Sequence, residues 1–334
     1  MSQQLTTLRA LFVHNDWARD SLLDTARPLA DEALDDPVQM GPGSLRATLE
    51  HLCRSERWWL DRWQGSADPL DAPEPGISVS ELQSRFRATA TERDAFLDDR
   101  DEAEQIACTT DTGGTLRLAL SDMMLHVCNH GFHHRAQALN MLRQVDVKPP
   151  DIDYLYITLD PSVKFNPTYE LDVIRAYYQY NDWARERILK AAAPLDDDEL
   201  DRPFKIGLGT LRKTLLHIRD AEQWWLLNWS GESADLFAEL PETTPIGGLR
   251  KETAEIARHR RELFDTLGDG DLTRTVTASP RPGVEMSFKL GDAMVQLGGH
   301  GTHHRAQVLN MLRRLDVEGP GIDLADWTKE SAQG

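Results

Sequence analysis

The chain carries most of its sequence twice. NDWARDSLLDTARPL, which starts at Asn15, returns as NDWARERILKAAAPL from Asn181, and GSLRATLEHLCRSERWW returns as GTLRKTLLHIRDAEQWW at the same distance of 166 residues. HGFHHRAQALNMLR from His130 returns as HGTHHRAQVLNMLR from His300, 170 residues later, with 12 of 14 positions identical. A period near 170 residues is the size of a whole domain, not of one unit in a solenoid. The 334 residues therefore predict two similar domains.

The duplication also sets the expected domain boundaries. We assign residues 1–150 to the first copy, 151–165 to a linker, 166–324 to the second copy and 325–334 to a loose tail. The two offsets differ by four residues, so the insertion must lie between the second and last helices of the second copy.

Apolar residues at helical spacing predict four helices in each copy. The first spans 7–26 or 168–192, and the second begins at Ser44 or Thr210 and ends at Gly65 or Gly231. The third spans 80–98 in the first copy, where Ser80 and Gln83 resemble a capping box. The fourth spans 121–143 or 292–314.

A short alternating stretch before each fourth helix predicts a β-hairpin. VEMSFKL places Val284, Met286 and Phe288 on one side, and LRLAL does so more weakly, with Gly113 and Gly114 as its turn. The predicted fold class is all-α: two tandem four-helix bundles, each with a short hairpin before its last helix. The long QGSADPLDAPEPGISVS connection permits a crossover, so the topology need not be up-down-up-down.

Composition and charge narrow the class of protein. Hydrophobic residues make up 40% and charged residues 28%, as in soluble globular proteins. The net charge of −18 repels phosphate backbones, so nucleic acid is not an expected partner. The start of the chain lacks a signal-peptide pattern and no run approaches 18 apolar residues, so we expect a cytoplasmic protein with no membrane partner. Cys53, Cys108 and Cys128 form no CxxC pair, which argues against disulfides and thiolate zinc sites; Cys128 is expected in the core.

Histidines recur at the same positions in both copies. His130 and His134 lie four residues apart, so their side chains project from one helix face and can place two nitrogens at roughly 2.0 to 2.1 Å from a divalent transition metal. Outside the fourth helix, His51 is the one histidine that both copies share, and it supplies a third ligand if the second and fourth helices face each other. The predicted metal ligands are His51, His130 and His134 in the first copy and His217, His300 and His304 in the second.

Alternatives to this ligand set stay open. His133 and His303 lie three residues from the first histidine of each pair, which also falls on one face; we prefer the four-residue pair and expect the middle histidine at the bundle edge or behind the ligands. The clustered histidines could instead pack a helix interface as satisfied core or surface residues. The second copy has Gln296 in place of His126, which excludes that position from the shared set. His14 and His259 are expected at the surface or partly buried.

Further polar residues recur near the triads, and none of them is assigned as the general base. Glu56 and Glu222 point about 140° away from the helix-two histidine, so we expect them to be surface or interface charges. The remaining pairs carry two interpretations each. Asp16 and Asp182 are helix-face charges or partners of an imidazole N–H; Arg135, Arg305, Gln137 and Gln307 hold an anionic substrate or pair with carboxylates; Trp58, Trp59, Trp224 and Trp225 are core residues or pocket walls.

The residues resemble a known family. Trp17-Ala18 late in the first helix, Gly-Ser/Thr-Leu-Arg ahead of the histidine on the second, and H-x-x-x-H-H-R-x-Q on the fourth are similar to the DinB/YfiT-like superfamily of metal-binding four-helix bundles, here in tandem over nearly the whole chain. The resemblance implies an up-down-down-up topology and the same six metal ligands. It also implies homodimers among relatives, so the two copies here are expected to form an intrachain pseudo-dimer, with a monomeric chain as one option. Characterised relatives are transferases or isomerases that use a low-molecular-weight thiol.

The donor set bounds the chemistry. Three neutral nitrogens leave a coordination position open, as in catalytic sites, where the pKa of a water falls towards neutrality or a thiol binds as thiolate. Imidazole ligands without a carboxylate favour Zn²⁺ or Ni²⁺. The sequence predicts a metalloprotein that is most simply a thiol-dependent S-transferase acting on a small electrophile; a metal-dependent hydrolase and a non-catalytic metal- or ligand-binding protein are the alternatives.

Overall fold

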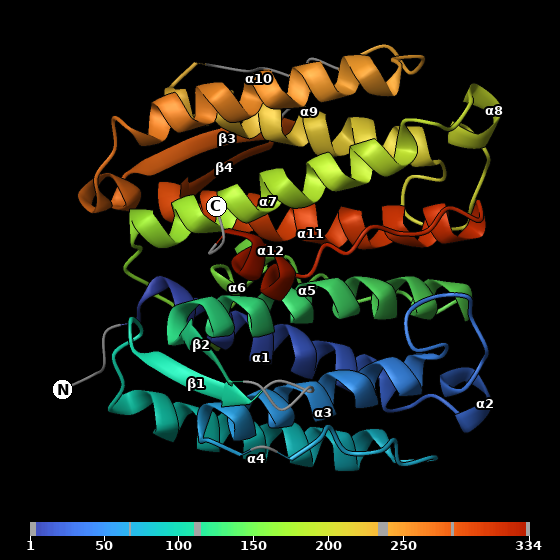
Figure 1. Cartoon of the computed structure of the whole chain (residues 1–334), viewed down its shortest axis with the longest axis vertical. Helices are drawn as coiled ribbons and strands as arrows, with labels where there is room; N and C mark the ends of the chain where they lie inside the picture. The colour runs from blue at the N-terminus through green and yellow to red at the C-terminus, as the bar shows by residue number, and fades with distance from the viewer. Residues whose placement is uncertain (1–4, 67, 110–114, 233–239, 282–283, 332–334) are drawn as a thin grey trace. The chain divides into compact units, whose positions relative to one another are not determined.

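The computed structural model describes residues 5–66, 68–109, 115–232, 240–281 and 284–331, and it divides into two compact units. The N-terminal bundle comprises the described residues of 11–151 together with 323–331. The C-terminal bundle comprises those of 152–322 together with 5–10. Each bundle therefore takes a short segment from the far end of the chain. The described residues are mostly helical, and the strands form two small hairpins, as the sequence predicts (Figure 1).

The C-terminal bundle shows how the four long helices run. They are α7 (Leu171–Ala192), α9 (Leu211–Ser230), α10 (Ile246–Phe264) and α11 (Leu290–Arg314). Tyr178 contacts Trp229 on α9 and Phe264 on α10, near the far end of each, so both helices are antiparallel to α7. The hydroxyl of Tyr178 donates to the carbonyl of Met294 near the start of α11. Helix α11 therefore runs with α7, and the topology is up-down-down-up, as the resemblance implies.

The N-terminal bundle repeats this arrangement. Its long helices are α1 (Thr7–Ala26), α3 (Leu45–Trp63), α4 (Val79–Asp98) and α5 (Leu120–Gln144). Thr48 contacts Met141, and Trp59 contacts His126, so α3 and α5 are antiparallel neighbours. This pairing brings the second and fourth helices face to face, which is the arrangement that the histidine pattern requires.

Each fourth helix follows a two-stranded antiparallel hairpin. The hairpins consist of β1 (Gln105–Thr109) with β2 (Thr115–Ala119), and of β3 (Thr275–Arg281) with β4 (Val284–Lys289). Phe288 is buried, as expected for the apolar side of the strand. The turn expected at Gly113 and Gly114 lies outside the described residues. The segment 265–289 is four residues longer than 99–119, which places the insertion of the second copy around the longer hairpin and the 3-10 helix η1 (Asp269–Thr273).

Local sequence sets where the histidine-bearing second helices start. The Ser44 hydroxyl accepts the N–H of Ala47 at 3.1 Å, and the Thr210 hydroxyl accepts that of Lys213 at 3.1 Å, so both caps lie where the sequence predicts them. Two buried arginines then fix the preceding turn. Arg46 pairs with Asp31 and Asp35 at the two ends of α2 (Asp31–Leu34), and Arg212 pairs with Asp197 and Asp201 at the two ends of α8 (Asp197–Leu200).

Several expected boundaries are wrong. Ser78, not Ser80, caps the third helix by accepting the N–H of Glu81. The first helix of the second copy begins at Leu171 instead of Thr168. Both fourth helices begin slightly earlier, because each starts directly at the end of its hairpin strand.

The linker and the tail contain helices that the sequence analysis did not predict. Within 151–165, α6 (Tyr154–Ile157) packs against α11, with Tyr154 and Ile157 buried. The tail forms α12 (Leu324–Ser331), which packs against α5 through buried Leu324. The expectation of a loose tail is therefore wrong for residues 325–331, which belong to this helix.

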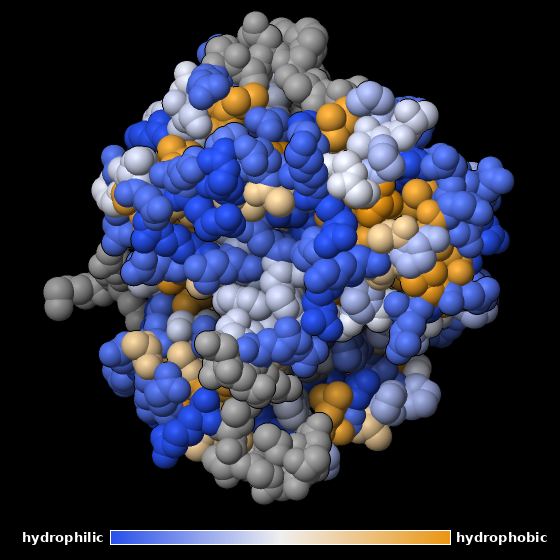
Figure 2. Space-filling view, turned by 45° about the horizontal axis from the view of Figure 1, so that its top comes forward, coloured by the Kyte–Doolittle hydropathy of each residue, from blue (hydrophilic) through white to orange (hydrophobic). Residues whose placement is uncertain are grey.

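None of the described helices is long and apolar enough to cross a membrane. Most residues on the face shown in Figure 2 are hydrophilic, with smaller hydrophobic groups between them.

Candidate metal centres

Three histidines converge inside the N-terminal bundle. His51 comes from α3, and His130 and His134 come from successive turns of α5. The Nε2 atoms of His51 and His130 lie 3.2 Å apart, and the ring centroids of His51 and His134 lie 4.6 Å apart. One nitrogen from each of the three rings lies within 4.8 Å of the other two.

The C-terminal bundle repeats this geometry closely. The Nε2 atoms of His217 on α9 and His300 on α11 lie 3.0 Å apart. The ring centroids of His217 and His304 lie 4.6 Å apart, and those of His300 and His304 lie 4.4 Å apart. The structure thus brings together all six histidines that the sequence analysis selected, in two groups of three.

Both groups could hold a metal ion. Two nitrogens that each lie about 2.0–2.1 Å from one ion in tetrahedral geometry are roughly 3.3 Å apart, close to the separations of the paired Nε2 atoms. Among the described residues, each group consists of histidines alone, with no carboxylate or cysteine in it. The donors therefore suit a borderline cation such as Zn²⁺ or Ni²⁺ better than Mg²⁺ or Mn²⁺.

A glutamine orients one histidine of each group, which sequence reasoning did not foresee. The Nδ1 of His134 lies 2.9 Å from Oε1 of Gln137, an acceptor, so Nδ1 donates and Nε2 keeps its lone pair for the cluster. His304 and Gln307 form the same bond at 2.9 Å. Gln137 and Gln307 are therefore positioned behind the ligands, and neither interpretation given to them from the sequence applies. The signal was their spacing of three residues from the second ligand.

The middle histidine completes this arrangement. Nε2 of His133 lies 2.9 Å from Nε2 of Gln137, and Nε2 of His303 lies 3.0 Å from that of Gln307. The amide N–H₂ donates to the imidazole, which fixes the orientation of the amide and leaves its oxygen for the ligand histidine. His133 and His303 thus lie behind the ligands, as expected for the middle histidine.

A glycine lets each glutamine approach. Gly41 has φ +50° and Gly207 has φ +49°, in the left-handed region that side chains disfavour. A Cβ at Gly41 would lie 2.2 Å from Oε1 of Gln137, and one at Gly207 would lie 2.2 Å from that of Gln307. The turn before each second helix therefore forms a wall against which the glutamine is held.

Burial keeps the clustered rings neutral. Burial, followed by the charges of neighbouring histidines, lowers the pKa values of four rings well below the usual range: His130, His134, His300 and His304. Burial also lowers the pKa values of His51 and His217. Neutral imidazole is the form that coordinates a metal, so the rings stay competent as ligands below neutral pH.

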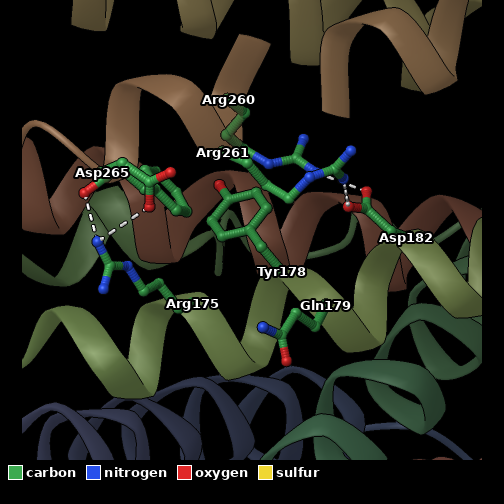
Figure 3. A pocket seen from close by; sticks show the side chains of 8 residues that line it. Arg175, Tyr178, Gln179, Asp182, Arg260, Arg261 and Asp265 are labelled. Carbon is green, nitrogen blue, oxygen red and sulfur yellow. Dashed lines mark hydrogen bonds and ion pairs between the residues drawn. The ribbon is translucent and has the colours of Figure 1, made fainter. Parts of the chain in front are cut away.

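The acidic residues near the triads form buried ion pairs. In the C-terminal bundle Arg185 donates to Glu222 at 2.6 Å and to Asp182 at 2.8 Å, and Arg260 binds the same two carboxylates. Burial acts to raise the pKa of Asp182, but Arg260 and Arg185 outweigh it and the pKa is lowered. Figure 3 shows Asp182 and Arg260 of this cluster beside a cavity of about 300 Å³, where Arg175 also reaches Asp265.

The N-terminal bundle builds the corresponding cluster differently. Arg19 and Arg93 bind Asp16, while Glu56 accepts from Asn15 at 2.9 Å and lies 3.4 Å from Arg19. Burial raises the pKa of Glu56, whereas Arg93 and Arg19 outweigh burial at Asp16 and lower its pKa. The expectation that Glu56 and Glu222 are surface or interface charges is wrong, because both are buried against arginines. Asp16 and Asp182 are half-buried helix-face charges that bind these arginines.

Two further expectations fail because the side chains are buried. Arg135 donates to Asn15, and Arg305 donates to Thr302 at 2.9 Å, so both belong to the core. Burial lowers the pKa of Arg135 to about 10.

His14 is fully buried and stacks on Phe132 with ring centroids 5.1 Å apart, because this position faces the core in both copies. Cys128 is buried and His259 is exposed, as expected.

The position one turn before the first ligand of α5 differs between the bundles. In the N-terminal bundle it is His126, whose ring centroid lies 6.0 Å from that of His130 and 4.7 Å from that of Trp59. The Nδ1 atom of His126 lies 2.9 Å from Oδ1 of Asp323, which precedes α12. A titratable side chain therefore lies beside this triad.

In the C-terminal bundle the same position is Gln296. Its Oε1 accepts the backbone N–H of Leu155 in α6 at 3.1 Å. A cavity of about 220 Å³ opens here, with His217 and His300 in its lining together with Ala221 and Trp224. This confirms, for the second copy, that a tryptophan two turns from the helix-two histidine walls a space beside it.

The fold and the two clusters define a class: a tandem pair of up-down-down-up helical bundles, each with a three-histidine candidate metal centre between its second and fourth helices. The chain belongs to the DinB family, whose sequence profile matches residues 1–160 and 165–333. It is 23% identical over 164 residues to Protein DinB of Bacillus subtilis (strain 168), an alignment that covers 46% of this chain and 95% of that protein. No solved structure matches the chain significantly.

Proposed function

We propose that each bundle binds one divalent transition metal ion, zinc or nickel, and that the protein is a metal-dependent enzyme, most simply a thiol-dependent S-transferase acting on a small electrophile. The observation that carries the proposal is the convergence of three imidazole nitrogens at coordination spacing, built twice with the same supporting glutamine. Helix packing alone does not require that both copies keep a glutamine on the same ligand nitrogen.

The residues of this chain divide the work between them. His51, His130 and His134, or their counterparts in the second copy, would hold the ion, which supplies a Lewis acid that lowers the pKa of a bound thiol or water. Gln137 holds His134 in the tautomer that presents Nε2. The buried position of the rings, with their lowered pKa values, keeps protons from competing at neutral pH.

Among the described residues, each group offers a metal ion three protein ligands, all of them histidine nitrogens. Three protein ligands favour a catalytic site over a purely structural one. Structural zinc sites are usually closed by four protein ligands, whereas catalytic sites keep one position for substrate. In the C-terminal bundle the cavity beside His217 and His300 supplies a route to that position.

Metal analysis of the purified chain tests the binding step. We expect two equivalents of metal in the wild type and one in each of His51→Ala and His217→Ala, with none in the double variant. His259→Ala is the matched control, because His259 is an exposed histidine outside both groups and should leave two equivalents bound. A wild-type chain that takes up no zinc or nickel when dialysed against either ion would exclude both centres.

Activity assays separate the candidate reactions. The metal-loaded chain is incubated with monochlorobimane and a series of cellular thiols, and with activated esters and amides as hydrolysis substrates. Metal-dependent transfer with at least one thiol supports the transferase. Hydrolysis without any thiol requirement supports the hydrolase alternative. An open coordination position would serve a bound water in hydrolysis as well as a bound thiol in transfer. If neither reaction depends on His51 or His217, a non-catalytic metal-binding role is the better assignment.

A further inference from the structure

The cavity beside the second centre has walls from five segments, one of which is β3 through Ala278. Ala221, Trp224 and Trp225 come from α9, and Met286 and Phe288 come from the hairpin strand β4. The segment around α6 and the helix α11 close the remaining sides. All these residues belong to the C-terminal bundle, so the cavity is formed within one compact unit.

The lining is mainly apolar. Two tryptophans, a phenylalanine and a methionine form its sides, while the described lining residues include no lysine or arginine. The cavity in Figure 3 has a charged lining instead, since Arg175, Arg260 and Arg261 line it and pair with carboxylates. The polar lining residues are the two histidines, Gln296 and Asp153, so recognition beside the metal centre comes mainly from apolar contact and shape.

The mouth carries exposed apolar side chains. Tyr156 is 45% exposed and Leu159 is 56% exposed, and both line the cavity. Only four large hydrophobic residues of the described chain are exposed to this degree, and the other two, Leu70 and Leu208, do not line it. Apolar residues that gather at the rim of a cavity, while the rest of the surface is strongly charged, indicate a binding site.

The α6 segment is held over the centre by a specific bond. Oε1 of Gln296 accepts the N–H of Leu155, which places Leu155, Tyr156 and Leu159 against the cavity. In the first copy His126 occupies this position and lies beside Trp59 and Asp323, so that side of the first centre is polar. The bond that joins the α6 segment to Gln296 is thus a feature of the second centre.

We propose that the C-terminal centre takes a small, uncharged, mainly apolar substrate of one or two rings, with its reacting group at His217 and His300 and its body between Trp225, Phe288 and the α6 segment. A volume of about 220 Å³ lies below the roughly 300–1,000 Å³ of pockets for drug-sized ligands, which sets the size. Tyr156 and Leu159 determine specificity at the mouth. This inference rests on the proposed function only for the position of the reacting group.

Binding of 2-naphthol to the metal-loaded, full-length chain tests the proposal by isothermal titration calorimetry. We expect one site per chain and a negative heat-capacity change, the mark of apolar burial. Leu159→Lys and Tyr156→Ser should each weaken binding by about fivefold or more, as expected for a lost apolar contact of roughly 1 kcal/mol. Both residues are exposed, so folding is preserved. Leu70→Lys is the matched control, because Leu70 is 40% exposed in the other bundle and should leave the affinity unchanged.

The outcomes separate this inference from the metal proposal. If 2-naphthol does not bind, or binds Leu159→Lys and Tyr156→Ser as tightly as the wild type, the apolar site is refuted even when two metals are bound. If 2-naphthol binds the chelated, metal-free chain and the two variants weaken it, the apolar site stands whatever the metal analysis gives. Glucose, a polar molecule of similar size, should not compete; competition by glucose would overturn the assignment of an apolar substrate.

Discussion

The two bundles share their ligand histidines and differ in what surrounds them. Each has three histidines from the same two helices, a glutamine on the second helix-four ligand, and a positive-φ glycine behind that glutamine. Around this common unit, the N-terminal bundle has His126 beside Asp323, and the C-terminal bundle has Gln296 and an apolar cavity. The comparison shows that the two bundles share the geometry of the three-histidine group and differ in the residues next to it.

The buried carboxylates give the largest expected difference between the bundles. Glu222 is bound by two arginines, so Glu222→Gln should cost about 3–5 kcal/mol of unfolding free energy by leaving buried charge uncompensated. Glu56→Gln should cost less, about 1–2 kcal/mol, because burial already raises the pKa of Glu56 and its Asn15 bond survives in the amide.

Urea unfolding, read through hydrogen exchange of α9 and α3, measures these two losses separately. Equal losses in both variants would mean that the two networks are energetically equivalent despite their different partners.

Removing the supporting glutamine tests whether the two centres are equivalent. Gln137→Leu and Gln307→Leu should each lower metal affinity by about 10–100-fold at their own site, because the ligand histidine loses the bond that fixes its tautomer. Competition with a chromophoric chelator measures both affinities. Gln179→Leu is the control, since Gln179 is an exposed residue away from both groups and should change neither affinity. A loss at one centre alone would show that only one depends on the glutamine.

The glycine wall gives a smaller and more local effect. Gly41→Ala should destabilise the N-terminal bundle by about 1–3 kcal/mol and weaken its metal centre, because the new Cβ displaces Gln137. Gly43→Ala is the matched control: it also has positive φ, at +102°, but a Cβ there meets no atom within 4 Å. Gly43→Ala should therefore share the loss of stability and leave metal affinity intact. Weakened metal binding in both variants would mean that backbone strain in the turn, and not the contact with Gln137, weakens the metal centre.

The smallest effect concerns acid stability. Arginines lower the folded pKa values of Asp16 and Asp182 against burial, so these ion pairs stabilise fully above about pH 4 and their contribution is lost as pH falls through the folded pKa. The unfolding free energy should therefore fall less steeply with acid in Asp16→Asn for the N-terminal bundle and in Asp182→Asn for the C-terminal bundle. An unchanged slope below pH 4, measured by urea unfolding at a series of pH values, would contradict this account.

Much of the fold was predictable, because each sequence pattern in one copy can be compared with the same pattern in the other copy. Helix starts at Ser44 and Thr210, and the converging triads, follow from local spacing and from which histidines recur. Boundaries next to hairpins were less accurate, since a strand that leads directly into a helix leaves no capping signal. The tail was misjudged, because the contacts of α12, such as the burial of Leu324, are made with distant parts of the chain.

The candidate site was predictable in its ligands and not in its supports. Gln137 was assigned to substrate or carboxylates, and Glu56 to the surface or an interface, because sequence alone does not show which face a polar side chain meets. Glu56 is buried, and Arg19 and Asn15 reach it from α1. Such partners come from helices far apart in the chain, and no local spacing encodes them.

The sequence by itself determined that the chain contains two similar helical bundles and that two histidines share one face of each fourth helix, because helical periodicity fixes which residues share a face. Only the tertiary structure decided that Gln137 and Gln307 orient the ligands, that α6 closes an apolar cavity over the second centre, and that His126 meets Asp323 near the first. These contacts join segments distant in sequence, and the packing of whole helices is what brings them together.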